Sequence, residues 1–168
     1  MPAAPKRKPS KSDVSRPGKQ GDYDIFTADL TTGAVRQVTS GPFWNDAPRW
    51  SPDGWRLLFV SNRSGTPEIW VMRADGDSPT RLTATDRWNH SPTWSPDGKV
   101  LIMHTLGQDT ADDLHFLEVG VGDKVEPFRV TPFSEFMPTF SPDGRWIAFS
   151  GEYSGTRQIY VVPYEGGV

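Results

Sequence analysis

The three histidines of this 168-residue chain are the first residues to weigh as catalysts or metal ligands. His90, His104 and His115 show no metal-binding spacing such as His-Glu-x-x-His. The sequence contains no Gly-x-Ser-x-Gly motif, so it lacks the nucleophile of an α/β-hydrolase domain. It also has no Cys, which excludes disulfides and thiolate metal sites. We therefore expect no catalytic site, no metal and no cofactor.

One acidic segment offers oxygen ligands. Asp109, Asp112 and Asp113 lie in and after a loop, and together they could hold a cation. Their order matches no calcium-binding loop. We favour the interpretation that this is a solvated acidic loop.

Three short segments are better suited to binding than to catalysis. They are 43–46, 87–90 and 133–136, and we call them the leading loops because each comes before a predicted strand. Aligned on the proline that follows, Trp44 matches Trp88. Aromatic rings provide a large rigid contact area, and polar neighbours orient a partner on it. The predicted binding residues are Trp44, Asn45, Asp46, Trp88, Asn89, His90, Glu135 and Phe136. The alternatives are that the tryptophans pack against neighbouring units of the fold and that the polar residues cap loop backbone.

A repeat positions these loops. The tetrapeptide Ser-Pro-Asp-Gly begins at Ser51, Ser95 and Ser141, at offsets of 44 and 46 residues. An aromatic residue precedes each copy, and a proline lies two residues before that aromatic. Two further landmarks share the period: an Ile-aromatic or similar pair, and an Arg-x-x-Thr or Arg-x-Thr segment. Chance is a poor explanation for three landmarks with one period.

The landmarks predict strands and turns. Pro, Asp and Gly suit successive positions of a tight turn, so Ser-Pro-Asp-Gly predicts a hairpin in which the Asp has a structural role. The run from Arg56 to Ser61 that follows is apolar on consecutive residues, which indicates burial on both faces. We place the preceding aromatics, Trp50, Trp94 and Phe140, in the core. No segment has helical periodicity.

The repeat resembles the blade of the TolB family, and the propeller blades of the prolyl oligopeptidase family are similar. The resemblance implies an all-β fold, a β-propeller of four-stranded blades. Residues 1–21 are expected to be a disordered basic leader, and 22–168 a stretch of propeller with about 3.25 blades. The expected blades are 22–39 (partial), 46–83, 90–131 and 138–163 (partial). Either the chain is a fragment of a longer propeller, or two chains form a homodimer that closes a six-bladed ring, the number typical of TolB.

Charge is unevenly distributed along the chain. Residues 1–20 carry a net charge of +5, which leaves −8 for the rest because the whole chain is at −3. An acidic domain would repel a phosphate backbone, so we expect no nucleic-acid partner. There is no signal-peptide pattern and no apolar run long enough to span a membrane. The sequence as given predicts a cytoplasmic protein, or a periplasmic one if it is a truncated TolB.

These observations favour a non-catalytic TolB-like propeller that acts as a protein-binding scaffold for a protein or peptide. Two alternatives stay open. The chain could be the propeller portion of a prolyl-oligopeptidase-like hydrolase whose catalytic domain is absent here. It could also be a sensor module of a larger regulator.

Overall fold

The computed structural model describes residues 23–85, 87–107 and 111–165. Over these residues the chain forms four antiparallel sheets, and no described segment is helical. This confirms the predicted all-β fold, a partial β-propeller built from four-stranded units. The basic leader and Asp109 lie outside the described residues.

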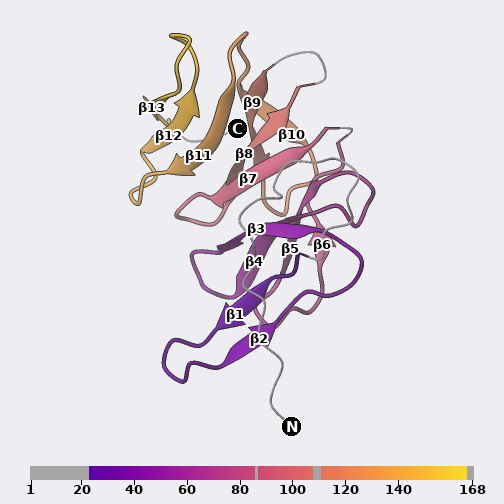
Figure 1. The fold of residues 1–168 in the computed structure, drawn as a ribbon. Helices are drawn as coiled ribbons and strands as arrows, with labels where there is room; N and C mark the ends of the chain where they lie inside the picture. Colours follow the sequence, from indigo (N-terminus) through magenta and orange to yellow (C-terminus); the bar gives the residue numbers. More distant parts are fainter. Residues whose placement is uncertain (1–22, 86, 108–110, 166–168) are drawn as a thin grey trace.

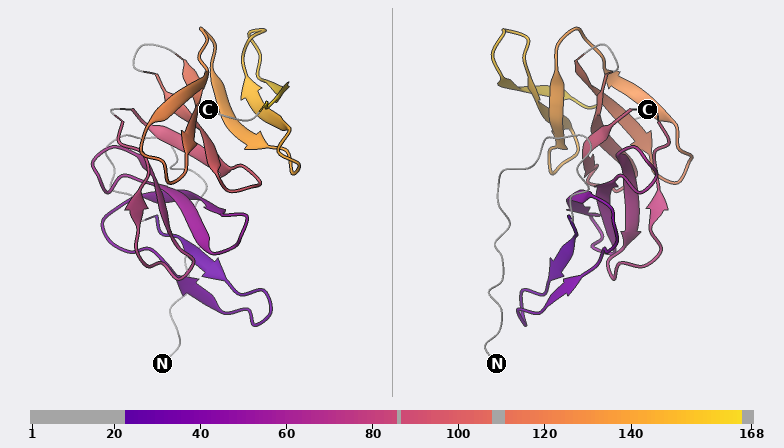
Figure 2. Two further views of the ribbon diagram at one scale, coloured as in Figure 1. Left: turned by 180° about the vertical axis from the view of Figure 1, so that it is seen from behind. Right: turned by 45° about the vertical axis from the view of Figure 1, so that its right-hand side comes forward.

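Each sheet is formed by strands that are consecutive in the sequence. The first sheet pairs β1 (Phe26–Ala28) with β2 (Val35–Gln37). The second contains β3 (Asn45–Trp50), β4 (Arg56–Ser61), β5 (Glu68–Arg73) and β6 (Thr80–Arg81). The third contains β7 (Asn89–Trp94), β8 (Val100–Leu106), β9 (Asp112–Glu118) and β10 (Val125–Arg129). The fourth contains β11 (Glu135–Phe140), β12 (Trp146–Gly151) and β13 (Gln158–Pro163). The sheets follow one another in chain order from indigo to yellow in Figure 1, and the two views of Figure 2 show the same succession.

The Ser-Pro-Asp-Gly segments form hairpins between the first and second strands of each blade. In the third sheet, Asp97 Oδ1 accepts hydrogen bonds from Ser95 Oγ at 2.6 Å and from Lys99 N at 3.1 Å. Gly98 has a φ of 72°, a left-handed conformation that glycine adopts without the steric cost of a Cβ. The other two hairpins contain the same bonds, which confirms the structural role predicted for these aspartates.

Successive hairpins stack on one another. A Cβ on Gly98 would lie 3.7 Å from Pro52 Cδ, and one on Gly144 would lie 3.6 Å from Pro96 Cδ. The proline of one blade therefore covers the glycine of the next. Another approach is closer still, because a Cβ on Gly76 would lie 2.6 Å from the carbonyl oxygen of Val38, the residue directly after β2.

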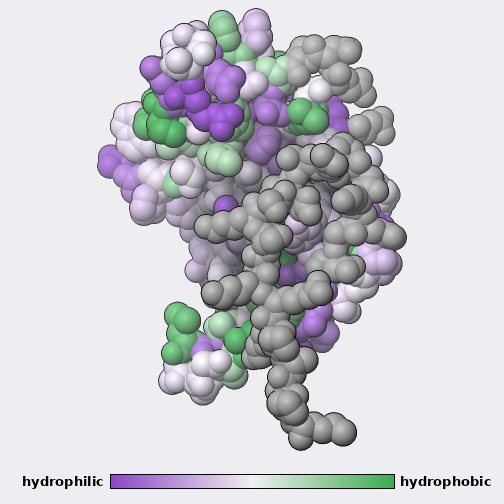
Figure 3. Space-filling view, viewed as in Figure 1, coloured by the Kyte–Doolittle hydropathy of each residue, from purple (hydrophilic) through white to green (hydrophobic). Residues whose placement is uncertain are grey.

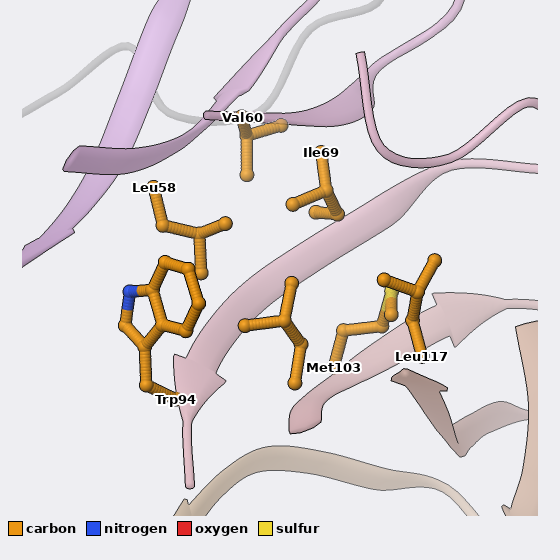
Figure 4. Close-up of a cluster of buried hydrophobic side chains, with 7 residues drawn as sticks. Leu58, Val60, Ile69, Trp94, Met103 and Leu117 are labelled. Atoms are coloured by element: carbon orange, nitrogen blue, oxygen red, sulfur yellow. The ribbon is translucent and has the colours of Figure 1, made fainter. Parts of the chain in front are cut away.

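The apolar core lies between neighbouring sheets. β4 is buried along nearly its whole length, as its continuous apolar sequence predicts. Figure 4 shows Leu58 and Ile69 of the second sheet facing Trp94 and Met103 of the third. Similar clusters fill the junctions on either side. A buried large apolar side chain contributes roughly 1.5–3 kcal/mol, so these junctions stabilise the fold more than any single hydrogen bond.

The prediction that Trp50 belongs to the core is wrong. Trp94 and Phe140 are 6% and 9% exposed, whereas Trp50 at the equivalent position is 52% exposed. Trp94 packs on Leu58 in the second strand of the preceding sheet. The sheet before Trp50 contains only β1 and β2, so the described residues include no second strand for it to cover.

The first and last strands in chain order, β1 and β13, occupy the same place in a blade. Ile25 and Ile69 each donate a backbone N–H to a threonine hydroxyl, at 2.8 Å and 2.9 Å, so β1 corresponds to the third strand β5. β13 is also a third strand, because it pairs with β12 as β5 pairs with β4. A blade shared between two chains would therefore contain five strands, one more than the four of a full blade.

Apolar side chains are exposed at the end that contains β1. In Figure 3 the hairpin of β1 and β2, at the lower left, shows hydrophobic residues on its surface. Phe26 in β1 is 56% exposed, and Leu30 in the turn between the two strands is 97% exposed. These side chains belong to the half-blade and not to the leading loops.

Candidate functional site

The leading loops lie against the ends of the second strands or the residues that directly follow them. Trp44 N donates to Asn62 Oδ1 at 2.8 Å, and Asn62 N donates to the Trp44 carbonyl at 3.3 Å. Leu106 N donates to the Trp88 carbonyl at 2.9 Å, and Glu152 N donates to the Ser134 carbonyl at 3.2 Å. Because three blades share this contact, these loops form one surface opposite the hairpins, which we call the loop face.

A bulge near the start of each first strand shapes the loop face. The pairing register shifts between Asp46 and Arg49, and β7 and β11 shift at the same place. Ala47, Ser91 and Met137 lie in these bulges with φ values of 50°, 46° and 55°. A residue with a Cβ costs on the order of 1–2 kcal/mol in this left-handed region. Bulges redirect side chains, so the recurring strain marks the point where the strand turns toward the loop face.

A buried hydrogen-bond network joins the second sheet to the third. Glu68 accepts the hydroxyl hydrogen of Thr83, the Thr85 N–H at 2.8 Å and an Asn89 side-chain N–H at 2.9 Å. Glu68, Thr83 and Asn89 are at most 1% exposed. Burial raises the pKa of Glu68, and these hydrogen bonds lower it in part. We call this arrangement of a carboxylate, a threonine and a first-strand residue the junction latch.

The first junction has the same latch. Thr39 donates its hydroxyl hydrogen to Asp24 Oδ1 at 2.9 Å, and Asn45 Nδ2 lies 3.4 Å from the same oxygen. The guanidinium of Arg63, from the loop after the second strand, donates to Asn45 Oδ1 at 2.9 Å. Asn45 is 3% exposed and therefore serves the junction.

In the third junction the carboxylate that accepts the threonine hydrogen bond belongs to the first strand of the following sheet. In the second junction it belongs to the third strand of the preceding sheet. Glu135, at the place of Asn89, accepts the Thr131 hydroxyl hydrogen at 2.6 Å and the hydroxyl hydrogen of Tyr153. Arg129 Nε lies 3.6 Å from Glu135 Oε1. Glu135 is completely buried. Asn45, Asn89 and Glu135, three residues of the predicted binding set, thus direct their side chains into the junctions.

The remaining predicted residues gather around His90. Its ring centroid lies 5.9 Å from that of Trp44 and 6.1 Å from that of Trp88, and it stacks on His104 at 5.6 Å. His104 lies opposite His90 on the neighbouring strand β8. We call these four rings the aromatic cluster. It spans two blades, because Trp44 belongs to the second and the other three belong to the third.

The aromatic cluster is uncharged at neutral pH. Burial lowers the pKa of His90, and the Asp46 carboxylate opposes this in part. Burial, together with His90, lowers the pKa of His104 to about 3. Asp46 is exposed, and its carboxylate has no hydrogen bond or ion pair within the described residues. The cluster is therefore a neutral, half-buried group of aromatic rings bordered by the Asp46 carboxylate. One of its rings, Trp44, also packs against the core between the second and third sheets.

Phe136 takes the place of His90 in the next blade, but another side chain covers it. It is 7% exposed, and the Arg157 guanidinium lies 4.1 Å from its ring centroid.

In the acidic segment, burial raises the pKa of Asp112, and the charges of Asp113 and Glu152 raise it further. Among the described residues no group of three or more His, Cys, Asp or Glu side chains is placed to hold a metal ion.

Sequence reasoning missed two kinds of residue. The latch threonines Thr39, Thr83 and Thr131 belong to a recurring landmark that indicates a shared structural role, although not its nature. His104 joins the aromatic cluster only through its pairing with His90, and the strand register between them shows this.

In the described ranges, no helix has the length and apolarity that a membrane span requires.

Comparison with known proteins places the repeat in a family. A family model for the TolB β-propeller domain matches residues 1–126. The Tol-Pal system protein TolB of Bordetella pertussis is 35% identical over 121 residues, which are 72% of this chain and 27% of that protein. A protein of Agrobacterium fabrum is 33% identical over 140 residues, which are 76% of this chain and 46% of that protein. The chain thus spans less than half the length of these relatives.

Solved structures share the fold. The crystal structure of TolB from Acinetobacter baumannii has a TM-score of 0.63 at 25% identity, covering 89% of this chain and 40% of that one. A puromycin-hydrolyzing peptidase of Mycobacterium tuberculosis has a TM-score of 0.68 at 19% identity, covering 86% of this chain and 25% of that one. The second similarity shows the fold alone.

Proposed function

Because the chain belongs to the TolB β-propeller family, we propose that it is a non-catalytic module whose loop face binds a protein or peptide partner. The observation that supports this most is the aromatic cluster. Trp44 and Trp88 present rigid aromatic area around His90, and aromatic residues of this kind dominate binding energy in protein interfaces. The buried junction latches hold the blades that carry these rings.

The relatives suggest the kind of partner. The Bordetella pertussis relative is a component of the Tol-Pal system by name. We propose that this chain likewise binds an envelope protein of that type, in the periplasm. The exposed carboxylate of Asp46 beside the rings would orient such a partner.

Photo-crosslinking followed by titration tests this function. A photoreactive phenylalanine replaces Leu106, which is 43% exposed and hydrogen-bonds to the leading loop. The control places it at Trp55, 73% exposed on the hairpin side. The crosslinked protein is purified, and its Kd is measured for the wild-type chain, Trp88→Ala and Trp55→Ala. We expect at least a tenfold weaker Kd for Trp88→Ala alone, since central aromatic residues typically contribute 2 kcal/mol or more. Equal affinities for all three chains would refute the loop face as the site.

The hydrolase alternative is supported by the fold similarity to the puromycin-hydrolyzing peptidase. In that case the loop face would gate substrates for a domain outside these 168 residues. It predicts that short free peptides bind the loop face and that no folded protein does. The same titration with a set of short peptides distinguishes the two functions.

The homodimer remains a proposal about assembly. Its shared blade would require β1 or β13 to leave its sheet, because both are third strands. Light scattering over a dilution series tests it. A monomer at every concentration would exclude a ring built from two chains.

A further inference from the structure

The leader joins the folded body beside the aromatic cluster. The carbonyl of Tyr23, the first described residue, accepts the backbone N–H of Asn45 at 3.0 Å and its side-chain N–H at 3.2 Å. Asn45 lies between Trp44 and Asp46 in the leading loop. Tyr23, which follows the leader in the sequence, is therefore bonded to the leading loop that carries the Asp46 carboxylate.

Charge favours contact between the leader and the rest of the chain. Residues 1–20 carry a net charge of +5, and the remainder of the chain carries −8. Opposite charges of this size attract over distances comparable to the Debye length, about 8–10 Å in physiological salt. An extended chain spans roughly 3.3–3.6 Å per residue, so Lys19 and Arg16 can reach about 14 Å and 25 Å from Tyr23. Tethering also raises the local concentration of these cations to the millimolar range.

The aromatic cluster has the chemistry of a site for a basic side chain. Ammonium and guanidinium groups bind over aromatic faces, and tryptophan is the best of these rings. Trp44 and Trp88 have their ring centroids 5.9 Å and 6.1 Å from that of the neutral His90, which does not repel a cation. Asp46 adds an exposed carboxylate with no partner among the described residues. Aromatic faces and this carboxylate together select a cation over an anion or a neutral group.

We propose that the aromatic cluster and Asp46 bind a lysine or arginine side chain from the leader of the same chain, so that the leader competes with the partner for the loop face. The competition rests on the proposed function of that face, whereas occupancy by the leader does not. A leader from a second chain has the same chemistry, and the experiment below distinguishes the two sources.

Paramagnetic relaxation in the full chain tests occupancy directly. Because the chain has no Cys, Ser10→Cys takes a single nitroxide label in the leader. Seven indole N–H signals report its position. We expect the signals of Trp44 and Trp88 to relax at least twofold faster in the labelled wild-type chain than in Asp46→Asn. The difference should disappear in about 0.5 M NaCl, where screening is strong. Trp55 and Trp146, near the hairpins, serve as internal references, and Asp77→Asn as the matched charge control.

Three outcomes would overturn the proposal. Equal relaxation in the wild-type chain and in Asp46→Asn would show that the tether alone brings the label near. Enhancement that appears when labelled chains are mixed with isotope-labelled, nitroxide-free chains would show that the leader acts between chains. An unchanged partner Kd in Arg16→Gln/Lys19→Gln, where we expect several-fold tighter binding, would remove the competition. Failure of the proposed function is separate, because it appears as equal partner affinity of wild type and Trp88→Ala.

Discussion

Thr83 donates its hydroxyl hydrogen to the buried carboxylate of Glu68, and through Glu68 it is linked to Asn89 of the next blade. The same hydroxyl oxygen accepts the backbone N–H of Ile69 at 2.9 Å. One threonine at the end of a blade therefore satisfies a buried backbone group and a buried side chain at once.

Thr83→Val should destabilise the fold. The substitution keeps the shape but leaves the buried Ile69 N–H without its partner, which costs about 1–3 kcal/mol. It also removes one of the two hydrogen bonds to Glu68 Oε2, which keeps the bond from Asn89. Urea unfolding measures the loss. Thr80→Val, an exposed position in β6, is the control. A loss no greater than that of the control would contradict the structural role of the latch.

Gly76→Ala tests the close approach between the first and second sheets. The new Cβ would lie 2.6 Å from the Val38 carbonyl oxygen, and the φ of +90° is unfavourable for any residue with a Cβ. Gly33→Ala separates the two effects, because Gly33 has a φ of +72° and open space around it. We expect Gly76→Ala to lower the free energy of unfolding by a further 1–3 kcal/mol or so beyond Gly33→Ala, the usual cost of overpacking. Similar losses in the two variants would show that the sheets can move apart freely.

The two tryptophans before the first two hairpins should respond differently to truncation. Trp94→Ala opens a cavity between the second and third sheets and should cost about 3–5 kcal/mol. Trp50→Ala removes a side chain that is 52% exposed and should cost well under half as much. Denaturant unfolding of both variants gives the comparison directly. A comparable loss for Trp50→Ala would mean that Trp50 is covered in solution.

His104 should make stability depend on pH. Its pKa is lowered from 6.5 to about 3 in the folded chain, so between these values the unfolded state binds a proton that the folded state does not. Stability is therefore lost as the pH falls through this window, by up to about 1.4 kcal/mol per pH unit for this group. His104→Phe removes this contribution, and its free energy of unfolding should decrease less between pH 7 and pH 4.5 than that of the wild type. An identical decrease would show that His104 is already accessible to protons.

The sequence was sufficient for the architecture because each blade repeats the same local rules. The Ser-Pro-Asp-Gly turns and the consecutive apolar run at Arg56–Ser61 depend on neighbours in the chain, and both form as predicted. Trp50 was misplaced because its burial depends on strands of another blade, which no local pattern shows.

The candidate site was only partly predictable for the same reason. Alignment of the leading loops found Trp44, Trp88 and His90, which do lie together. It also grouped Asn45 and Asn89 with them, although alternate residues of a strand point to opposite sides and these two turn into the junctions. His104 needed the register between β7 and β8, a long-range property.

The stacking of Pro52 on Gly98 and of Pro96 on Gly144 has a consequence for how such an array grows. Every repeat carries both halves of this contact, a proline for the unit after it and a glycine for the unit before it. An in-frame duplication of one whole coding unit would therefore supply a matching surface on both sides of the new copy. This hairpin contact would therefore survive a change in the number of units. The latch, in which Glu135 takes the place of Asn89, would limit which unit can follow which.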